Sequence, residues 1–184
     1  MKLNVALRIS VVALAFALVG STSAFAKSSK PTRDWTKHPA VVEVETSEDV
    51  FAISDAHADY TRLAGVLVAA KIIGSVPDKP KQVIWIAGKS VLVIVGDMID
   101  KWKHSVRVIE LIRALQKSAA AQGGQVIATM GNHEAEFLAD PTGKKTKDFS
   151  KDLIKHNLKP KDVANCKGDL GQFLCQLPIA ARVN

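Results

Sequence analysis

Residues 125–134, Gln125-Val126-Ile127-Ala128-Thr129-Met130-Gly131-Asn132-His133-Glu134, are the most informative stretch of this chain. The apolar run in the first half predicts a buried strand. The second half supplies an amide oxygen and an imidazole immediately past the predicted end of that strand. Ligands of α/β proteins bind at the carboxyl ends of parallel strands, so this stretch predicts a functional site on such a sheet.

Two earlier segments have the same arrangement. Val50-Phe51-Ala52-Ile53-Ser54 is an apolar run followed by Asp55-Ala56-His57, and Val91-Leu92-Val93-Ile94-Val95 is followed by Gly96-Asp97-Met98-Ile99-Asp100. Because the carboxyl ends of parallel strands share one edge, we expect these polar groups and those after Gly131 to converge around one cavity.

The converging side chains are suited to two metal ions. Asp55, His57, Asp97 and Asn132 would offer carboxylate, imidazole and amide ligands of the kinds that Zn, Fe and Mn accept. A two-metal hydrolase places its ions roughly 4 Å apart, and Asp97 is the natural bridging carboxylate. The alternative is that these Asp and Asn residues only form turns and helix caps.

His133 is better suited to proton transfer than to metal binding, because its neighbour Asn132 already faces the ions. As a general acid it would protonate the leaving alkoxide, and it would need a partner that orients its ring. Asp100, which follows Asp97 by three residues, is the candidate partner.

These motifs resemble those of the calcineurin-like metallophosphoesterases, and most closely the bacterial relatives of PPP-type protein phosphatases. The family pattern is D-x-H-G, G-D-x-x-D-R-G and G-N-H-E, followed by two later histidines. The resemblance covers residues 50–137 and continues through the strand-like stretch 177–183. It implies a layered fold with a mostly parallel central sheet, of which this chain is the N-terminal part.

The resemblance also implies roles for individual residues. Asp55, His57 and Asp97 would bind the first metal ion, and Asp97 and Asn132 the second. His133 would be the general acid, oriented by Asp100, while a metal-activated hydroxide attacks phosphorus without a phospho-enzyme.

The chain departs from the family pattern at three positions beside the motifs. Ala58 replaces a frequent glycine, Lys101 replaces a phosphate-binding arginine, and Trp102 replaces the glycine after it. A lysine can hold a phosphate as a point charge but lacks the bidentate fork of arginine. We expect Lys101 and Asn132 to contact the substrate.

The two later histidines of the family have no match here. His156 is the one histidine after His133, and it lies in a lysine-rich segment, where a ligand role is not expected. We therefore expect an incomplete metallophosphoesterase domain over residues 41–184, with weak metal affinity and little activity.

Residues 1–26 have the features of a secretory signal peptide. Lys2 and Arg8 precede an apolar run over residues 9–20, and Ala24-Phe25-Ala26 is an A-x-A cleavage site. The run is shorter than the roughly 20 residues that span a bilayer. We expect cleavage after Ala26, export to a periplasm or beyond, and no membrane attachment afterwards. Residues 27–40 are a polar leader.

The composition limits the possible partners. Loss of Lys2 and Arg8 lowers the net charge from +7 to +5, a mild excess that favours anionic substrates. No arginine-rich or aromatic-interleaved patch indicates nucleic-acid binding. Cys166 and Cys175 could form a disulfide in an oxidising compartment or remain free thiols, and no nearby histidine points to a zinc site.

The remaining segments predict the other elements. Residues 41–45 form a first strand, 63–73 a helix that stops at Gly74, and 105–122 a second helix. Residues 83–86 and 91–95 predict a hairpin or a strand and its short return. The alternating order predicts an α/β fold.

Residues 141–169 predict a polar insertion, either a loop or a small helical cap. Eight lysines lie in it, seven of them between residues 144 and 161: Lys144, Lys145, Lys147, Lys151, Lys155, Lys159, Lys161 and Lys167. A solvated surface is the simpler interpretation, and gathering of phosphorylated substrates is the alternative.

The sequence therefore predicts an exported, metal-dependent phosphoesterase that acts on phosphate monoesters of a phosphoprotein or a small molecule. A phosphodiesterase or nucleotidase on the same fold is an alternative. A truncated module that binds phosphate or metal without turnover is another.

Overall fold

The computed structural model describes residues 33–184. The strands are β1 (Val41–Val44), β2 (Val50–Ser54), β3 (Val91–Val95), β4 (Gln125–Ala128) and β5 (Ala180–Val183). The helices are α1 (Tyr60–Ala69), α2 (Ser105–Ala120), α3 (Asn132–Ala139), α4 (Lys147–Lys155), α5 (Pro160–Ala164) and α6 (Gly168–Cys175), with a 3-10 turn η1 at Pro80–Gln82. The predicted signal peptide, residues 1–26, and residues 27–32 of the leader lie outside the described part.

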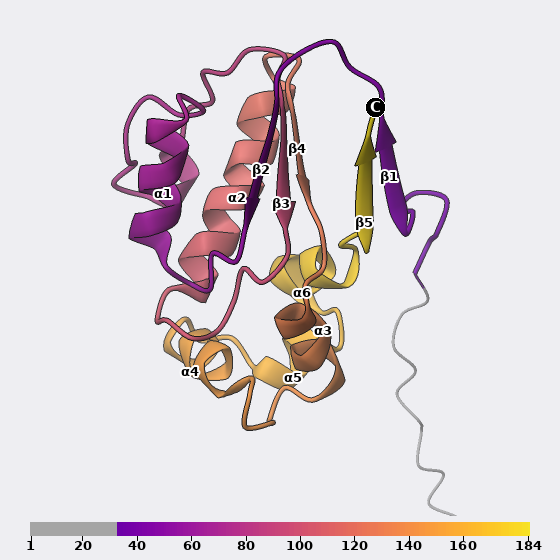
Figure 1. Cartoon of the computed structure of the whole chain (residues 1–184). Helices are drawn as coiled ribbons and strands as arrows, with labels where there is room; N and C mark the ends of the chain where they lie inside the picture. The colour runs from indigo at the N-terminus through magenta and orange to yellow at the C-terminus, as the bar shows by residue number, and fades with distance from the viewer. Residues whose placement is uncertain (1–32) are drawn as a thin grey trace, which may run out of the picture.

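Two parallel sheets form the framework. β2, β3 and β4 make a three-stranded sheet with β3 in the middle, where Val50 is in register with Val91, and Val91 with Gln125. β1 and β5 make a second, two-stranded sheet. This arrangement, visible in Figure 1, confirms the predicted α/β fold with parallel strands.

The larger sheet is covered on both faces, which explains why β3 is an unbroken apolar run. α1 and α2 pack on one face, where Leu67 and Leu111 join Leu92 in the main core. On the other face, Val93 and Ile127 pack against the sheet of β1 and β5. Figure 1 shows the resulting order of layers: helices, sheet and sheet.

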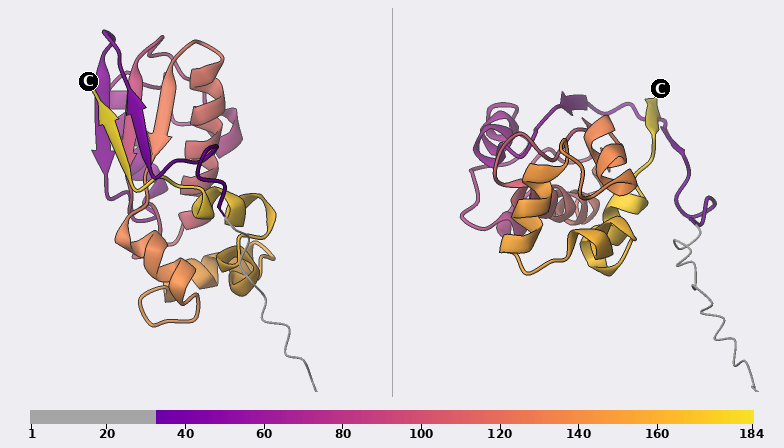
Figure 2. Two further views of the ribbon diagram at one scale, coloured as in Figure 1. Left: turned by 90° about the vertical axis from the view of Figure 1, so that its right-hand side faces the viewer. Right: turned by 90° about the horizontal axis from the view of Figure 1, so that it is seen from below.

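Helices α3 to α6 gather at one end of the molecule, beyond the carboxyl ends of β2, β3 and β4 (Figures 1 and 2). Residues 141–169 thus contain α4, α5 and the start of α6. A disulfide joins Cys166 to Cys175. No helix in the described part of the chain has the length and apolar character needed to cross a membrane.

The predicted hairpin between residues 83–86 and β3 is wrong. β3 already pairs with β2 on one edge and β4 on the other, so neither edge is free for a hairpin partner. The segment instead crosses α2, where Trp85 N–H donates to Ser118 Oγ at 2.9 Å, and Trp85 makes an isolated bridge with Ile73. Ile84 consequently remains 66% exposed.

The first helix also ends earlier than predicted, at Ala69 instead of Ile73. Lys71 has a left-handed backbone with φ of 56°, and the N–H groups of Ile72 and Ile73 both bond to the carbonyl of Leu67. These hydrogen bonds form a C-terminal cap that ends the helix. Ile73 is buried, although it lies beyond the end of the helix.

Candidate metal centre

Backbone hydrogen bonds fix the loops that follow β2 and β3 against each other. The N–H of His57 donates to the carbonyl of Asp97 at 2.9 Å, and the N–H of Ala58 donates to Met98 at 2.8 Å. The two predicted ligand loops are therefore one rigid unit.

The loops after β3 and β4 touch so closely that only glycine fits between them. A Cβ added to Gly131 would lie 2.2 Å from Asp97 Oδ1, and one added to Gly96 would lie 2.4 Å from the Cα of Gly131. Gly96 also has a φ of 60°, in the region that glycine adopts at little cost. This contact brings the Asn132 end of α3 onto the Asp97 loop.

Glu134 holds these loops together by hydrogen bonds, a role that was not predicted from its position in the sequence. Its fully buried carboxylate accepts N–H bonds from Asp97 and Gly131 at 2.9 Å, from Met98 at 2.8 Å and from Ile99 at 3.3 Å. Burial raises the pKa of Glu134, and the N–H donors of Gly131, Met98 and Asp97 oppose this shift. A glutamate at the third position of a helix is a known N-terminal capping signal, which could have indicated this role.

The predicted metal ligands converge. His57 Nε2 lies 3.4 Å from Asp55 Oδ2 and 3.9 Å from Asp97 Oδ2. Ligand atoms of His57, Asp97 and His133 all lie within 4.8 Å of one another. The Asn132 amide reaches Asp97 Oδ2 at 3.1 Å when its nitrogen is oriented to donate.

This set of donors fits a metal ion. The His57 ring presents Nδ1 to the carbonyl of Ile99 at 3.3 Å, which places the proton on Nδ1 and leaves Nε2 able to ligate. Carboxylates and neutral imidazoles are together suited to Mn, Fe or Zn. The side chain of Asp55 is 60% exposed, so an ion could reach the site from solvent.

His133 and Asp100 face each other without a formed hydrogen bond. His133 Nδ1 lies 3.5 Å from Asp100 Oδ2, and neither atom has a partner among the described residues. The other oxygen of Asp100 accepts the N–H of Phe149, at the start of α4, at 2.8 Å. Burial raises the pKa of Asp100, while the Phe149 N–H and His133 lower it. This approach suits an orienting role, although His133 also lies close enough to ligate an ion.

Lys101 lies on the open side of His57. Its Nζ is 2.7 Å from His57 Nε2, the atom that would face a metal. His156 is elsewhere and bonds through Nδ1 to the carbonyl of Asp152 at 2.8 Å.

Left-handed backbone conformations are concentrated in these loops. They occur at six non-glycine residues: Asp55, His57, Ala58, Asp97, Asp100 and Lys101. Each such conformation costs energy, and residues of this kind cluster at functional sites. The strain accords with a site whose side chains need fixed directions.

The comparison with known families agrees with this geometry. The calcineurin-like phosphoesterase family matches residues 49–183. This range includes strands β2 to β5 and every residue of the candidate metal centre. The chain belongs to this family of metallophosphoesterases.

Curated proteins of two organisms are similar to part of the chain. It is 29% identical over 90 residues to Shewanella-like protein phosphatase 2 of Arabidopsis thaliana, over 49% of this chain and 22% of that protein. It is 35% identical over 85 residues to an uncharacterized protein of Schizosaccharomyces pombe, over 46% of this chain and 24% of that protein. The chain thus spans about a quarter of the length of these curated relatives.

Solved phosphatases share the fold. A cold-active protein-tyrosine phosphatase of a Shewanella species aligns with a TM-score of 0.59 and 24% identity, covering 78% of this chain and 43% of that one. A Saccharomyces cerevisiae serine/threonine phosphatase aligns with a TM-score of 0.55 and 18% identity, covering 82% and 41%. The expected membership of the calcineurin-like metallophosphoesterases is confirmed by the family match, and these solved phosphatases share the fold of the chain.

Proposed function

We propose that this protein is an exported phosphatase that hydrolyses phosphate monoesters, on a phosphoprotein or a small molecule, with two metal ions of Mn, Fe or Zn. The observation that carries the proposal is the convergence of His57, Asp97 and His133 within 4.8 Å at the ends of three parallel strands. Export is supported by the signal-like pattern of residues 1–26.

The protein residues divide the work. Asp55 and His57 would hold one ion, Asn132 the other, and Asp97 both, because it lies between the two groups. Bound ions of this kind activate water and polarise the phosphoryl group.

His133 would supply the proton for the leaving group. With Nδ1 facing Asp100, its Nε2 is the atom available to protonate the departing alkoxide. Lys101 would bind a phosphate oxygen together with Asn132. Its ammonium must first leave His57, since it lies 2.7 Å from the nitrogen that an ion would use.

The test compares a monoester with a diester. The chain is loaded with Mn²⁺, and release of p-nitrophenol is followed from p-nitrophenyl phosphate and from bis(p-nitrophenyl) phosphate. Asp97→Asn should abolish turnover and Mn²⁺ binding, whereas Asp169→Asn, at an exposed side chain of α6, should change neither. Preferential hydrolysis of the monoester supports the proposal.

Two results would replace the proposal. Faster hydrolysis of the diester would identify a phosphodiesterase, and binding of Mn²⁺ and inorganic phosphate without turnover would identify a non-catalytic module.

Export is tested by N-terminal sequencing of the secreted protein. The first residue should be Lys27, and a first residue of Met1 would refute cleavage of the signal peptide.

A further inference from the structure

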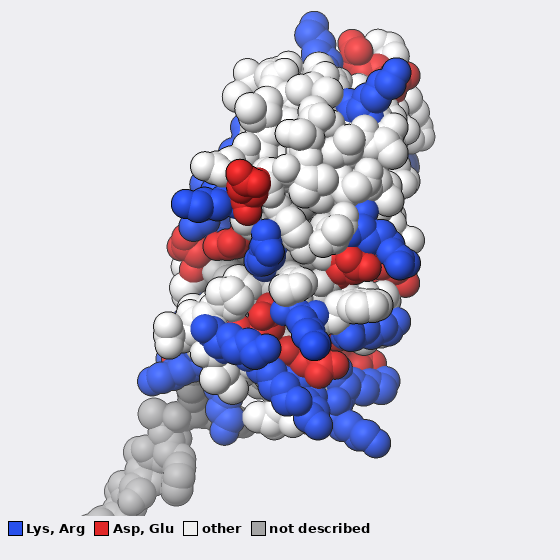
Figure 3. Space-filling view, turned by 90° about the vertical axis from the view of Figure 1, so that its left-hand side faces the viewer, with Lys and Arg blue, Asp and Glu red and all other residues white. Residues whose placement is uncertain are grey.

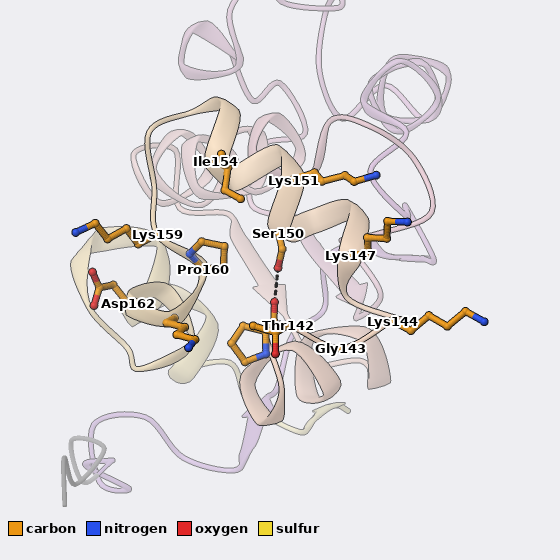
Figure 4. A pocket seen from close by; sticks show the side chains of 12 residues that line it. Thr142, Gly143, Lys144, Lys147, Ser150, Lys151, Ile154, Lys159, Pro160 and Asp162 are labelled. Carbon is orange, nitrogen blue, oxygen red and sulfur yellow. Dashed lines mark hydrogen bonds between the residues drawn. The ribbon is translucent and has the colours of Figure 1, made fainter. Parts of the chain in front are cut away.

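A pocket of about 570 Å³ lies between α4, the turn that precedes it and the start of α5. Figure 4 shows the side chains around it, including the hydrogen bond from Ser150 Oγ to the carbonyl of Pro141 that joins α4 to the turn. One face of α4 lines the pocket with four residues at helical spacing: Lys147, Ser150, Lys151 and Ile154.

The pocket combines an apolar centre with a basic rim. Pro141, Ile154 and Pro160 supply the apolar surface, and the Ile154 side chain is 61% exposed although it is a large aliphatic group. Five lysines also line it, Lys144, Lys147, Lys151, Lys159 and Lys161, and Figure 4 shows Lys144, Lys147 and Lys151 extending outward on one side. Figure 3 shows basic side chains gathered over the end of the molecule that carries these helices.

The positive charge is not neutralised within the described chain. None of these five lysines forms an ion pair with a described residue, whereas Lys145, which lies outside the pocket, pairs with Glu136 at 2.8 Å. Asp162 is the one acidic residue of the lining, and it pairs with Lys167 at 3.0 Å. Asp148, the neighbour of Lys147 on α4, does not line the pocket.

The arrangement of the lysines opposes helix stability. Lys147 and Lys151 are like charges four residues apart, which repel each other across one turn. Lys147 is also the first residue of α4, where the helix dipole favours an anion and disfavours a cation. A bound anion from outside would relieve both effects.

We propose that this pocket is a docking site for an acidic polypeptide segment that inserts one apolar side chain beside Ile154. A single phosphate is too small to engage five lysines around a pocket of this volume, and it has no use for the apolar centre. A concave pocket also suits an inserted side chain better than a flat lipid surface.

The docking site gives the proposed phosphatase a substrate class, and in this sense it rests on that function: the substrate is a phosphoprotein. α3 begins at the candidate metal centre with Asn132 and ends at Ala139, just before Pro141 of the pocket. Its eight residues span about 12 Å. An extended peptide covers that distance with about four residues, so the acidic segment would lie a few residues from the phosphorylated one.

The experiment measures binding directly, without turnover. A fluorescein-labelled, phosphate-free peptide of sequence Glu-Glu-Asp-Leu-Glu-Glu is titrated with the full chain, and anisotropy is recorded. The double variant Lys147→Glu/Lys151→Glu should weaken binding at least about tenfold, since each exposed charge contact contributes a few-fold. Ile154→Ala should weaken binding about threefold or more, because it removes part of the apolar contact.

The matched control is Lys155→Glu, a charge reversal on the same helix outside the pocket. It should change the affinity less than about twofold, as expected for one exposed charge that does not line the pocket. Circular dichroism establishes that each variant is folded. Lys147→Gln/Lys151→Gln serves as a milder second test, and it should weaken binding in the same direction.

Two results with the variants would overturn the proposal: a loss of peptide affinity in Lys155→Glu equal to that in the double variants, or no loss of affinity in either double variant. Tighter binding to vesicles that contain anionic phospholipid than to the peptide would also overturn it. So would loss of peptide binding in Asp97→Asn, which would place the peptide at the metal centre. Because no step requires hydrolysis, peptide binding can hold while the phosphatase assay fails, and the reverse can also occur.

Discussion

Gly131→Ala tests whether the contact between the loops after β3 and β4 builds the candidate metal centre. The added Cβ would lie 2.2 Å from Asp97 Oδ1 and 2.3 Å from Asp97 N, where ordinary contacts begin near 3.4 Å. Asp97 or α3 must therefore move by about 1 Å, the difference between these contact distances.

Neither side can move freely. Asp97 is held by its N–H bond to Glu134, at 2.9 Å, and by the bond that its carbonyl accepts from His57. Overpacking of this kind costs about 1–3 kcal/mol of folding free energy. Ligand distances in a metal site tolerate only about 0.2 Å, so a shift of about 1 Å should remove most of the Mn²⁺ affinity.

The assay combines urea unfolding with Mn²⁺ titration by calorimetry. The control is Gly65→Ala in α1, where an added Cβ meets nothing within 4 Å. That variant should gain about 0.5–1 kcal/mol of stability and bind Mn²⁺ as the native chain does. If Gly131→Ala keeps both its unfolding midpoint and its Mn²⁺ affinity, the close approach does not shape the site and the reasoning is refuted.

Three further predictions concern carboxylates. Asp100→Asn in a full-length relative should lower turnover at unchanged metal content, and loss of metal would show that Asp100 is a ligand. Glu134→Ala should destabilise the fold by about 3 kcal/mol or more in urea unfolding, because it leaves several N–H groups without an acceptor, each costing about 1–3 kcal/mol. The control is Glu136→Ala, at a partly exposed residue that loses its ion pair with Lys145; it should cost less than about 1 kcal/mol, and equal costs would contradict the role of Glu134. The hydrogen bond from the Thr142 hydroxyl is the main cause that lowers the pKa of Asp140 in the folded chain, so the ionised Asp140 stabilises the fold above its unfolded pKa, and this stabilisation is lost as the pH falls through its folded pKa. Thr142→Val should raise the titration midpoint of Asp140 measured by NMR, and an unchanged midpoint would exclude this cause.

Local patterns in the sequence were sufficient to predict the ligand loops. Each of the three motifs follows an apolar run, and parallel pairing then brings the strand ends to one edge without further information. The positions of Asp55, Asp97 and Asn132 therefore follow from the order of the elements along the chain.

Contacts between distant segments could not be predicted in the same way. The hairpin at residues 83–86 was a reasonable local prediction, and it is wrong because β2 and β4 occupy both edges of β3. The contact of Lys101 with His57, 44 positions away, depends on where two loops meet in space. The same holds for Glu134, whose carboxylate bonds to the backbone of Asp97 37 positions earlier.

The pairing of β1 with β5 has a consequence for the order of folding. Arg33 donates to the carbonyls of Cys175 and Leu177, at sequence separations of 142 and 144, so this layer joins the beginning of the described chain to its end. Contacts of such separation form slowly, because a long loop must close first. During synthesis β1 cannot pair until β5 has left the ribosome, and until then the sheet face that carries Val93 and Ile127 remains uncovered. While this apolar face is uncovered, the nascent chain is prone to aggregate.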